Sequence, residues 1–210
     1  MTEVARKIRL LMELRREGIT DTRVLSAIER VPREQFIPDT FQDRAYDNAA
    51  LPIGHGQTIS QPLVVATMTQ ALEIGPRMRV LEVGTGCGYQ TAVLCGLARR
   101  VYTIELVKEL QAEAEKRLLA IRVTNFTAIT GDGAKGWPDQ APFDRIIVTA
   151  APKRVPHMLI DQLADDGIMV IPIGEALDDQ WLECITKREG RVERKRMMPV
   201  RFVPLISAAV

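Results

Sequence analysis

The stretch from residue 79 to residue 105 constrains the fold of this chain more than any other. It opens on a short apolar run, residues 80–83, of the kind that a buried parallel strand shows. A glycine-rich loop, residues 84–88, follows, and glycine permits positive φ and close approach of a ligand to the backbone. An apolar helical face and a second apolar run, residues 101–104, complete a βαβ unit. The unit ends on Glu105 and predicts a nucleoside held by the glycine turn and this carboxylate.

The spacing of the glycines separates two classes of nucleotide-binding turn. A dinucleotide fingerprint needs G-x-G-x-x-G/A, but Tyr89 occupies the third position here. Glycines at alternate positions after the acid Glu82 instead resemble the first motif of Rossmann-like S-adenosylmethionine-dependent methyltransferases. That resemblance implies a loop bent around the amino-acid end of the cofactor, with Glu105 accepting hydrogen bonds from the ribose. A turn that serves only strand–helix packing stays open, because analogy of fold establishes no function.

Composition fits one α/β domain with an appendage. The chain has 210 residues, 46% of them hydrophobic, which is enough for a sizeable core. With a formal net charge of only +1, the protein has no overall electrostatic field that would attract it to nucleic acid or to a membrane surface. No apolar run reaches the roughly 18 residues of a membrane span, and the first ten residues are too charged for a secretory signal. We therefore expect a cytoplasmic protein without nucleic-acid or membrane partners; no feature encodes the oligomeric state, and a monomer is the simplest expectation.

Two amphipathic helices are predicted ahead of the βαβ unit. Apolar residues at helical spacing place the first over residues 4–14, with Thr2 as a candidate cap and Gly18 as its stop. The second covers residues 24–28, follows cap candidates at 20–22 and ends near a proline.

A long irregular segment, residues 33–56, follows these helices and predicts a compact loop or short hairpin. Such segments inside compact domains are often functional. Residues 1–62 are thus expected to form a helical cap and active-site loop on a core of residues 63–210, in one compact domain. Within that loop Ser60 precedes a helix predicted over residues 63–72, and taken alone its hydroxyl is best explained as a local cap.

A series of ordered motifs changes that interpretation. G-Q-T-I-S-Q-P at 56–62 precedes the glycine turn, G-D-G follows at 131–133, P-F-D-R-I-I-V-T-A-A at 142–151, and V-P-L at 203–205. Together they resemble the protein-L-isoaspartate (D-aspartate) O-methyltransferase family from about residue 20 to 205. The resemblance implies transfer of a methyl group from S-adenosyl-L-methionine to the free carboxylate of L-isoaspartyl and D-aspartyl residues in damaged proteins and peptides. This reaction initiates repair and leaves S-adenosyl-L-homocysteine.

The resemblance also assigns roles to individual residues. Ser60 is the implied catalytic residue, and Asp132 would accept a hydrogen bond from the adenine amino group; a plain Asp-Gly turn is the alternative for the latter. The implied cofactor-binding residues are Thr58, Ile59, Glu82, Gly84, Thr85, Gly86, Gly88, Glu105, Leu106, Asp132 and Gly133. The implied substrate-binding residues are Ser60, Val203, Pro204 and Leu205. Some relatives carry a hydroxyl residue where this chain has Ile206, so no side-chain contact is carried over there.

The remaining periodicities predict alternating helices and strands that end in a hairpin. The expected elements are helices at 110–121 and 158–163, strands at 126–130, 145–150 and 167–173, and an antiparallel hairpin of 181–186 with 192–197. The predicted fold is α/β, a Rossmann-like class I S-adenosylmethionine-dependent methyltransferase with a mostly parallel sheet, an antiparallel edge and an N-terminal helical cap. Trp137 and Trp181 are expected to serve packing. No metal is assigned, because His55 and His157 lack partners at metal spacing and the three cysteines are expected to be reduced thiols.

The chemistry of carboxyl methylation agrees with what the sequence lacks. A carboxylate is ionised at neutral pH because its pKa is about 4, so no general base is required. The D/N-P-P-Y/F motif of amine-methylating nucleobase enzymes is absent, since residues 149–152 read Thr-Ala-Ala-Pro. Three alternatives stay open: a small-molecule O-methyltransferase, an S-adenosylmethionine-binding sensor without catalysis, and, more remotely, a NAD oxidoreductase.

Overall fold

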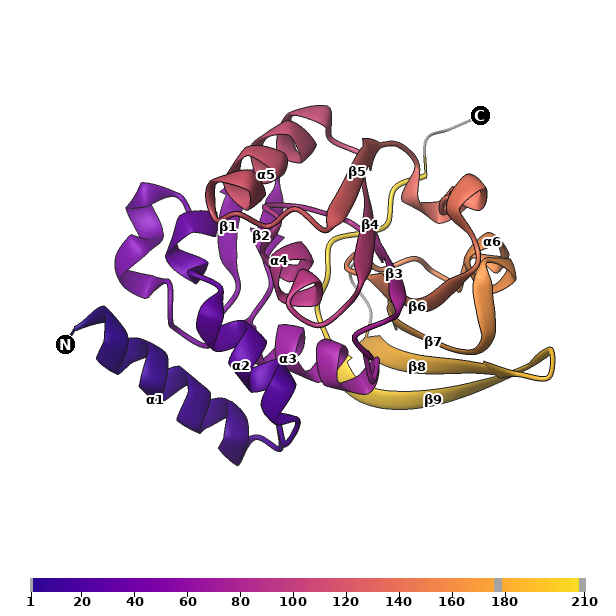
Figure 1. The fold of residues 1–210 in the computed structure, drawn as a ribbon, viewed down its shortest axis with the longest axis horizontal. Helices are drawn as coiled ribbons and strands as arrows, with labels where there is room; N and C mark the ends of the chain where they lie inside the picture. Colours follow the sequence, from indigo (N-terminus) through magenta and orange to yellow (C-terminus); the bar gives the residue numbers. More distant parts are fainter. Residues whose placement is uncertain (1, 176–178, 208–210) are drawn as a thin grey trace.

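A seven-stranded sheet forms the centre of the molecule in a computed structural model that describes residues 2–175 and 179–207 (Figure 1). The strand order is β5-β4-β3-β6-β7-β8-β9. Strands β3, β4, β5, β6 and β7 run parallel to one another, whereas β8 and β9 add an antiparallel edge. The strands are β3 (Arg79–Val83), β4 (Arg100–Glu105), β5 (Phe126–Thr130), β6 (Phe143–Val148), β7 (Leu163–Ile173), β8 (Gln180–Arg188) and β9 (Arg191–Val200). The predicted mostly parallel sheet with an antiparallel edge is confirmed.

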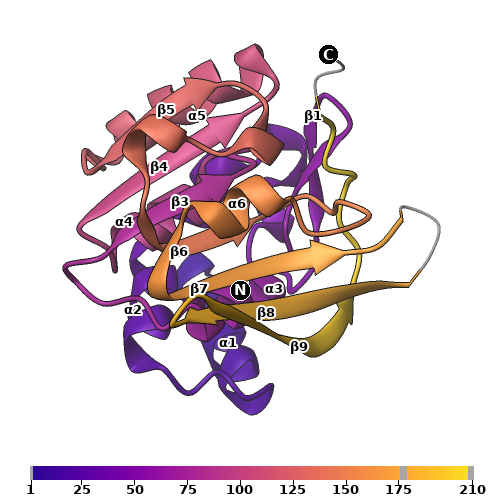
Figure 2. The same cartoon turned by 90° about the vertical axis from the view of Figure 1, so that its right-hand side faces the viewer.

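Helices cover both faces of the sheet. They are α1 (Glu3–Arg16), α2 (Thr22–Arg30), α3 (Pro62–Ala71), α4 (Tyr89–Cys95), α5 (Lys108–Ala120) and α6 (His157–Asp161), with short 3-10 turns η1 (Arg33–Phe36), η2 (Asp39–Arg44), η3 (Gly133–Lys135) and η4 (Pro138–Gln140). In Figure 1 the first five helices lie to the left of the sheet and α6 to its right, and Figure 2 shows α6 in front of the strands. Because both faces are covered, strand residues such as Val80 and Leu81 are buried in separate apolar clusters on opposite sides.

The N-terminal segment packs as a cap against the same cluster as the core helices. Thr2 caps α1 and Asp21 caps α2 through side-chain oxygens, as predicted. A small antiparallel pair, β1 (Leu51–Gly54) and β2 (Gln57–Ile59), forms a short hairpin, one of the two forms expected for residues 33–56, although its second strand lies just beyond that segment. The apolar residues that predicted α1 do not all face the protein: α1 buries Leu10 and Leu14, while Val4, Ile8 and Met12 are exposed.

Several predicted boundaries shift in the structure. The strand expected at 145–150 is β6 and ends at Val148, and the hydroxyl of the following Thr149 donates to the carbonyls of Val83 and Gly84. The helix expected at 158–163 stops at Asp161, and β7 begins at Leu163, where Gln162 already accepts a sheet bond from Phe143. Trp137 packs edge-on against Tyr102, as expected of a packing residue. Within the described residues no helix is long and apolar enough to cross a membrane.

Candidate active site

The candidate site lies at the carboxyl ends of the central strands. Strand β3 has β4 on one side and β6 on the other, so the chain order reverses there, and ligands of open α/β sheets bind at such switch points. A cavity of about 560 Å³ opens at this edge. Its walls are the glycine turn, residues 57–61 of the cap, and residues 198–206 near the C-terminus. A cavity of this size is typical of sites for small molecules and cofactors.

The cavity brings together most of the site residues predicted from sequence. Those that line it are Thr58, Ile59, Ser60, Gly84, Thr85, Gly86, Glu105, Leu106, Gly133, Val203, Pro204 and Leu205. Three predicted residues, Glu82, Gly88 and Asp132, do not line it. Glu82 and Gly88 are buried around the base of the turn, and Asp132 lies beside the cavity just before η3.

The glycine turn needs its glycines for two different reasons. Gly84 and Gly86 both have positive φ, at +95° and +54°, and both face the cavity. Gly88 also has positive φ, but a Cβ there would press on Ala114 and Leu118 of α5, so it lets α5 pack against the turn. The turn therefore serves strand–helix packing and cavity formation at the same time.

Glu105 is held rigidly at the tip of β4. Its Oε2 accepts from the Gly86 N–H at 2.8 Å, and its Oε1 accepts from the Val107 N–H at 3.0 Å. Each carboxylate oxygen keeps a further lone pair for a ligand hydroxyl. This arrangement fixes a negative charge on the cavity wall and joins β4 to the glycine turn.

Asp132 is oriented by two contacts. Its Oδ1 accepts from the Ala134 N–H at 3.0 Å, and its Oδ2 accepts from the Ser207 hydroxyl at 2.7 Å. A Cβ on the neighbouring Gly133 would overlap the Val83 side chain of the central strand, so a larger residue would displace either this loop or β3. Only glycine fits at 133 in this packing.

Glu82 is fully buried beneath the turn and anchors a chain of hydroxyl groups. Its Oε2 accepts from the Thr91 and Thr103 hydroxyls at 2.6 and 2.7 Å, and Thr103 in turn contacts the Thr85 hydroxyl at 2.6 Å. Burial raises the pKa of Glu82 to about 8, although the two hydroxyls favour the charged form. Thr85 reaches the cavity, so Glu82 supports the site from behind.

Because the pKa of the buried Glu82 is raised, we expect the stability of the protein to fall as pH rises. The unfolded chain releases the Glu82 proton near its ordinary pKa of 4.5, whereas the folded protein retains it to about pH 8. The free energy of unfolding should therefore fall as pH rises between these values, by up to about 1.4 kcal/mol per pH unit, and this contribution should level off above pH 8. Urea unfolding of wild type and Glu82→Gln at pH 5, 6.5 and 8 measures it. Parallel pH curves for the two proteins would contradict the prediction, since only the wild type carries this titration.

Ser60 is not the cap that sequence alone favoured for α3. The cap position is Gln61, which makes no side-chain cap bond, and Pro62 occupies the first helical turn as predicted. The Asn48 side chain instead accepts from the Leu63 N–H at 3.0 Å. Within the described part of the chain the Ser60 hydroxyl makes no hydrogen bond. A partly buried hydroxyl on the wall of the cavity is thus free to bind a ligand.

The C-terminal segment, residues 202–207, is attached across the cavity mainly through its backbone. The Ala151 N–H donates to the Val203 carbonyl at 2.8 Å, and the Leu205 N–H donates to the Ala151 carbonyl at 2.9 Å. Gln180 holds Phe202 from both sides, accepting from its N–H at 2.6 Å and donating to its carbonyl at 3.1 Å. The segment thereby forms a fixed wall opposite the cap.

Sequence reasoning missed residues whose partners are distant in the chain. Thr149 lines the cavity and donates to the Gly84 carbonyl at 2.7 Å, and Gln180 anchors the C-terminal segment. Tyr89, noted only because it breaks the dinucleotide pattern, also lines the cavity. The one available signal was position, since Thr149 follows the tip of a strand and Tyr89 follows the glycine turn.

Among residues 2–175 and 179–207, no group of three or more His, Cys, Asp or Glu is placed to hold a metal ion.

This chain is similar in sequence and in structure to known proteins. A sequence profile described as protein-L-isoaspartate(D-aspartate) O-methyltransferase matches residues 5–209. Curated relatives named protein-L-isoaspartate O-methyltransferase include one from Paramagnetospirillum magneticum, which is 59% identical over 96% of this chain and 94% of the relative. Another, from Rhodospirillum centenum, is 56% identical over 98% of this chain and 94% of the relative. A solved structure from Plasmodium falciparum, described as a putative protein-L-isoaspartate O-methyltransferase in complex with S-adenosyl-L-homocysteine, superposes with a TM-score of 0.81 at 29% identity, covering 94% of this chain and 97% of that one.

Proposed function

This chain belongs to the protein-L-isoaspartate(D-aspartate) O-methyltransferase family, and we propose that Ser60 holds the carboxylate that it methylates. The enzyme transfers a methyl group from S-adenosyl-L-methionine to isoaspartyl residues of damaged proteins, which initiates their repair. Family membership decides against the three alternatives left open by the sequence. A small-molecule O-methyltransferase would need a different acceptor, a sensor would lack catalysis, and a NAD oxidoreductase would need a different cofactor. Activity on D-aspartyl residues is part of the proposal.

The residues around the cavity fit the cofactor. We propose that Glu105 accepts from the ribose hydroxyls, that Asp132 accepts from the adenine amino group, and that the glycine turn surrounds the amino-acid end. Glu105 is ready for this because its orientation is fixed by two backbone N–H groups. Bound S-adenosylmethionine supplies an electrophilic methyl group. We propose an indirect role for Glu82 and Gly88, which support the turn from outside the cavity.

The proposed task of the protein in the acceptor half of the site is orientation. A carboxylate needs no deprotonation at neutral pH, and alignment of reacting groups contributes on the order of 7–11 kcal/mol. Ser60 would donate its hydroxyl proton in a hydrogen bond to one carboxylate oxygen and leave the other to face the methyl group. Val203, Pro204 and Leu205 would hold the peptide in extended form. The observation that carries this proposal is the unpartnered Ser60 hydroxyl, among the described residues, in the same cavity as Glu105 and the C-terminal segment.

Ser60→Ala tests the role of the serine. Turnover on an isoaspartyl peptide should fall at least tenfold, because the acceptor loses its orienting bond, which for a charged partner is worth about 1.5–3 kcal/mol. The affinity for S-adenosylhomocysteine should change less than twofold. Labelled methyl transfer to an isoaspartyl peptide, with the matching aspartyl peptide as blank, measures turnover, and calorimetric titration with S-adenosylhomocysteine measures the affinity. Ser26→Ala on α2 is the control, and unchanged turnover in Ser60→Ala would remove Ser60 from the mechanism.

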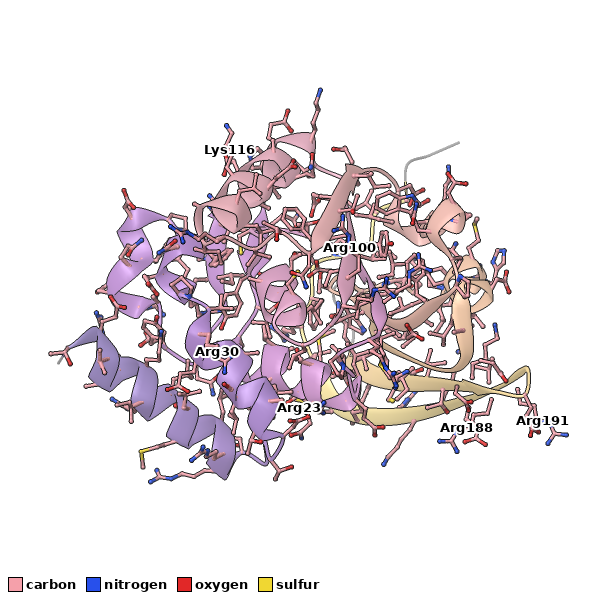
Figure 3. The ribbon with its side chains drawn as sticks, in the orientation of Figure 1. Arg23, Arg30, Arg100, Lys116, Arg188 and Arg191 are labelled. Atoms are coloured by element: carbon pink, nitrogen blue, oxygen red, sulfur yellow. The ribbon has the colours of Figure 1, made fainter. Side chains whose placement is uncertain are left out.

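We also propose the organisation and setting of the enzyme. Residues 1–62 act as a cap on the core of residues 63–210, and their shared apolar cluster, which joins Leu14 to Val80, favours one compact domain. The three cysteines are free thiols, which supports a cytoplasmic location. Figure 3 shows labelled basic side chains on separate elements, from Arg23 on α2 to Arg188 and Arg191 at the far end of the β8–β9 hairpin. This dispersion supports an enzyme that acts on damaged proteins and not on nucleic acid, and we propose that it does so as a monomer.

A further inference from the structure

Arg33 is a charged side chain with no exposure to solvent. It lies on η1, in the irregular segment between α2 and the small hairpin, and its relative exposure is 0%. Burying an ionised group is costly unless partners replace its hydration. Burial lowers the pKa of Arg33, yet arginine stays protonated in proteins. The fold therefore keeps a positive charge in its interior, and the hydrogen bonds of Arg33 show which segments this charge stabilises.

The contacts of Arg33 are backbone carbonyls from one loop. Its Nε donates to the Ala45 carbonyl at 3.0 Å, and its Nη2 donates to the carbonyls of Ser60 and Ala49 at 2.9 and 3.5 Å. No carboxylate contacts the guanidinium among the described residues, and Nη1 has no partner there. Arg33 thus ties the two ends of the loop, residues 45–60, to a single rigid group.

The guanidinium also contacts the cofactor side of the site. It lies over the ring of Tyr89, 4.7 Å from the ring centroid, and Tyr89 is the first residue of α4 after the glycine turn. Phe36, one turn along η1, packs edge-on against the same ring at 5.7 Å. Arg33 is therefore the buried link between the loop that ends at Ser60 and the helix that begins beside the cofactor cavity.

We propose that Arg33 is a positioning residue that sets the orientation of Ser60 for methyl transfer, an inference that rests on the proposed role of Ser60. The Ser60 hydroxyl has no partner in the described chain, so its direction depends on the backbone that carries it. That backbone is fixed at the Ser60 carbonyl by Arg33 and, three residues later, by Asn48 on the Leu63 N–H. Displacement of a catalytic group by about 1 Å can cost about a hundredfold in rate, so such a support matters.

A double-mutant cycle between Arg33→Lys and Ser60→Ala tests this proposal. Lysine keeps the charge but concentrates its donors on one nitrogen, which cannot reproduce the planar fork that reaches three carbonyls. With Ser60 present, Arg33→Lys should lower kcat on an isoaspartyl peptide about tenfold, leave the peptide KM within twofold, and leave the affinity for S-adenosylhomocysteine within twofold. In the Ser60→Ala background the same substitution should lower kcat less than twofold, because the group that it positions is gone.

The controls separate positioning from folding. Turnover is counted per S-adenosylhomocysteine-binding site, which removes any unfolded fraction, and Arg30→Lys on the exposed end of α2 should leave every parameter unchanged. Arg33→Gln, which keeps an amide donor without charge, is the second variant if Arg33→Lys does not fold. Equal losses of kcat in the wild-type and Ser60→Ala backgrounds would overturn the inference, as would loss of cofactor binding in both Arg33 variants. Full activity of Ser60→Ala itself would instead overturn the proposed role of Ser60, on which this inference rests.

Discussion

Replacement of Glu105 by glutamine is expected to weaken binding of S-adenosylmethionine about a hundredfold. Hydrogen bonds to charged groups are worth about 1.5–3 kcal/mol, and a hundredfold corresponds to about 2.8 kcal/mol. Glutamine loses the charge proposed to bind the ribose hydroxyls. Its amide nitrogen must also face a donor, either the Gly86 N–H or the Val107 N–H, because both carboxylate oxygens accept one backbone bond now. Calorimetric titration with S-adenosylmethionine, in the absence of a methyl acceptor, measures the loss.

A control for this prediction lies four residues away. Glu109 is exposed in the first turn of α5 and outside the cavity, so Glu109→Gln should leave cofactor affinity unchanged. The thermal midpoint of Glu105→Gln should be recorded as well, because the glycine turn loses part of its support. Wild-type affinity in Glu105→Gln would contradict the assignment of this carboxylate to the ribose.

Substitution of Gly84 by alanine should destabilise the protein by about 2–5 kcal/mol. A non-glycine residue at positive φ costs about 1–2 kcal/mol, and overpacking a rigid site adds about 1–3 kcal/mol. Gly84 combines both penalties, since its φ is +95° and a Cβ there would overlap the Thr149 hydroxyl oxygen. Thr149 cannot easily turn away, because that hydroxyl donates to the carbonyls of Val83 and Gly84. Urea unfolding followed by circular dichroism measures the loss.

Two variants divide this effect into its parts. Gly18 has nearly the same φ, +94°, but nothing lies within 4 Å of a Cβ placed there, so Gly18→Ala should show the backbone penalty alone. Thr149→Ala removes the overlapping oxygen, and the double variant with Gly84→Ala should lose less than the sum of the single changes. Equal effects of Gly18→Ala and Gly84→Ala would show that the overlap is relieved by a small shift.

The parts of the site that sequence predicted are those with local signatures. The turn and Glu105 could be predicted because an apolar strand, alternate glycines and an acid at the next strand tip follow one another within 27 residues. The sheet was predicted for the same reason, since buried parallel strands appear as short apolar runs between turn residues.

The parts that sequence missed depend on contacts between distant segments. Arg33 lies in a stretch without periodicity, and its bond to Ser60 spans 27 residues. Gln180 holds Phe202 across 22 residues through backbone atoms that every residue type offers. The face of α1 was also ambiguous, because Val4, Ile8 and Met12 follow helical spacing as well as Leu10 and Leu14 do, and only packing selects between the two sets.

The way in which residues 202–207 are attached has an evolutionary consequence. Main-chain atoms bind Val203 and Leu205 to Ala151, so mutations at these positions can accumulate without detaching the segment. Ile206 is exposed and lines the cavity, so its side chain can change while the backbone bonds of Val203 and Leu205 still hold the segment. A wall held in this way tolerates changes of its side chains without a rearrangement of the backbone that carries them.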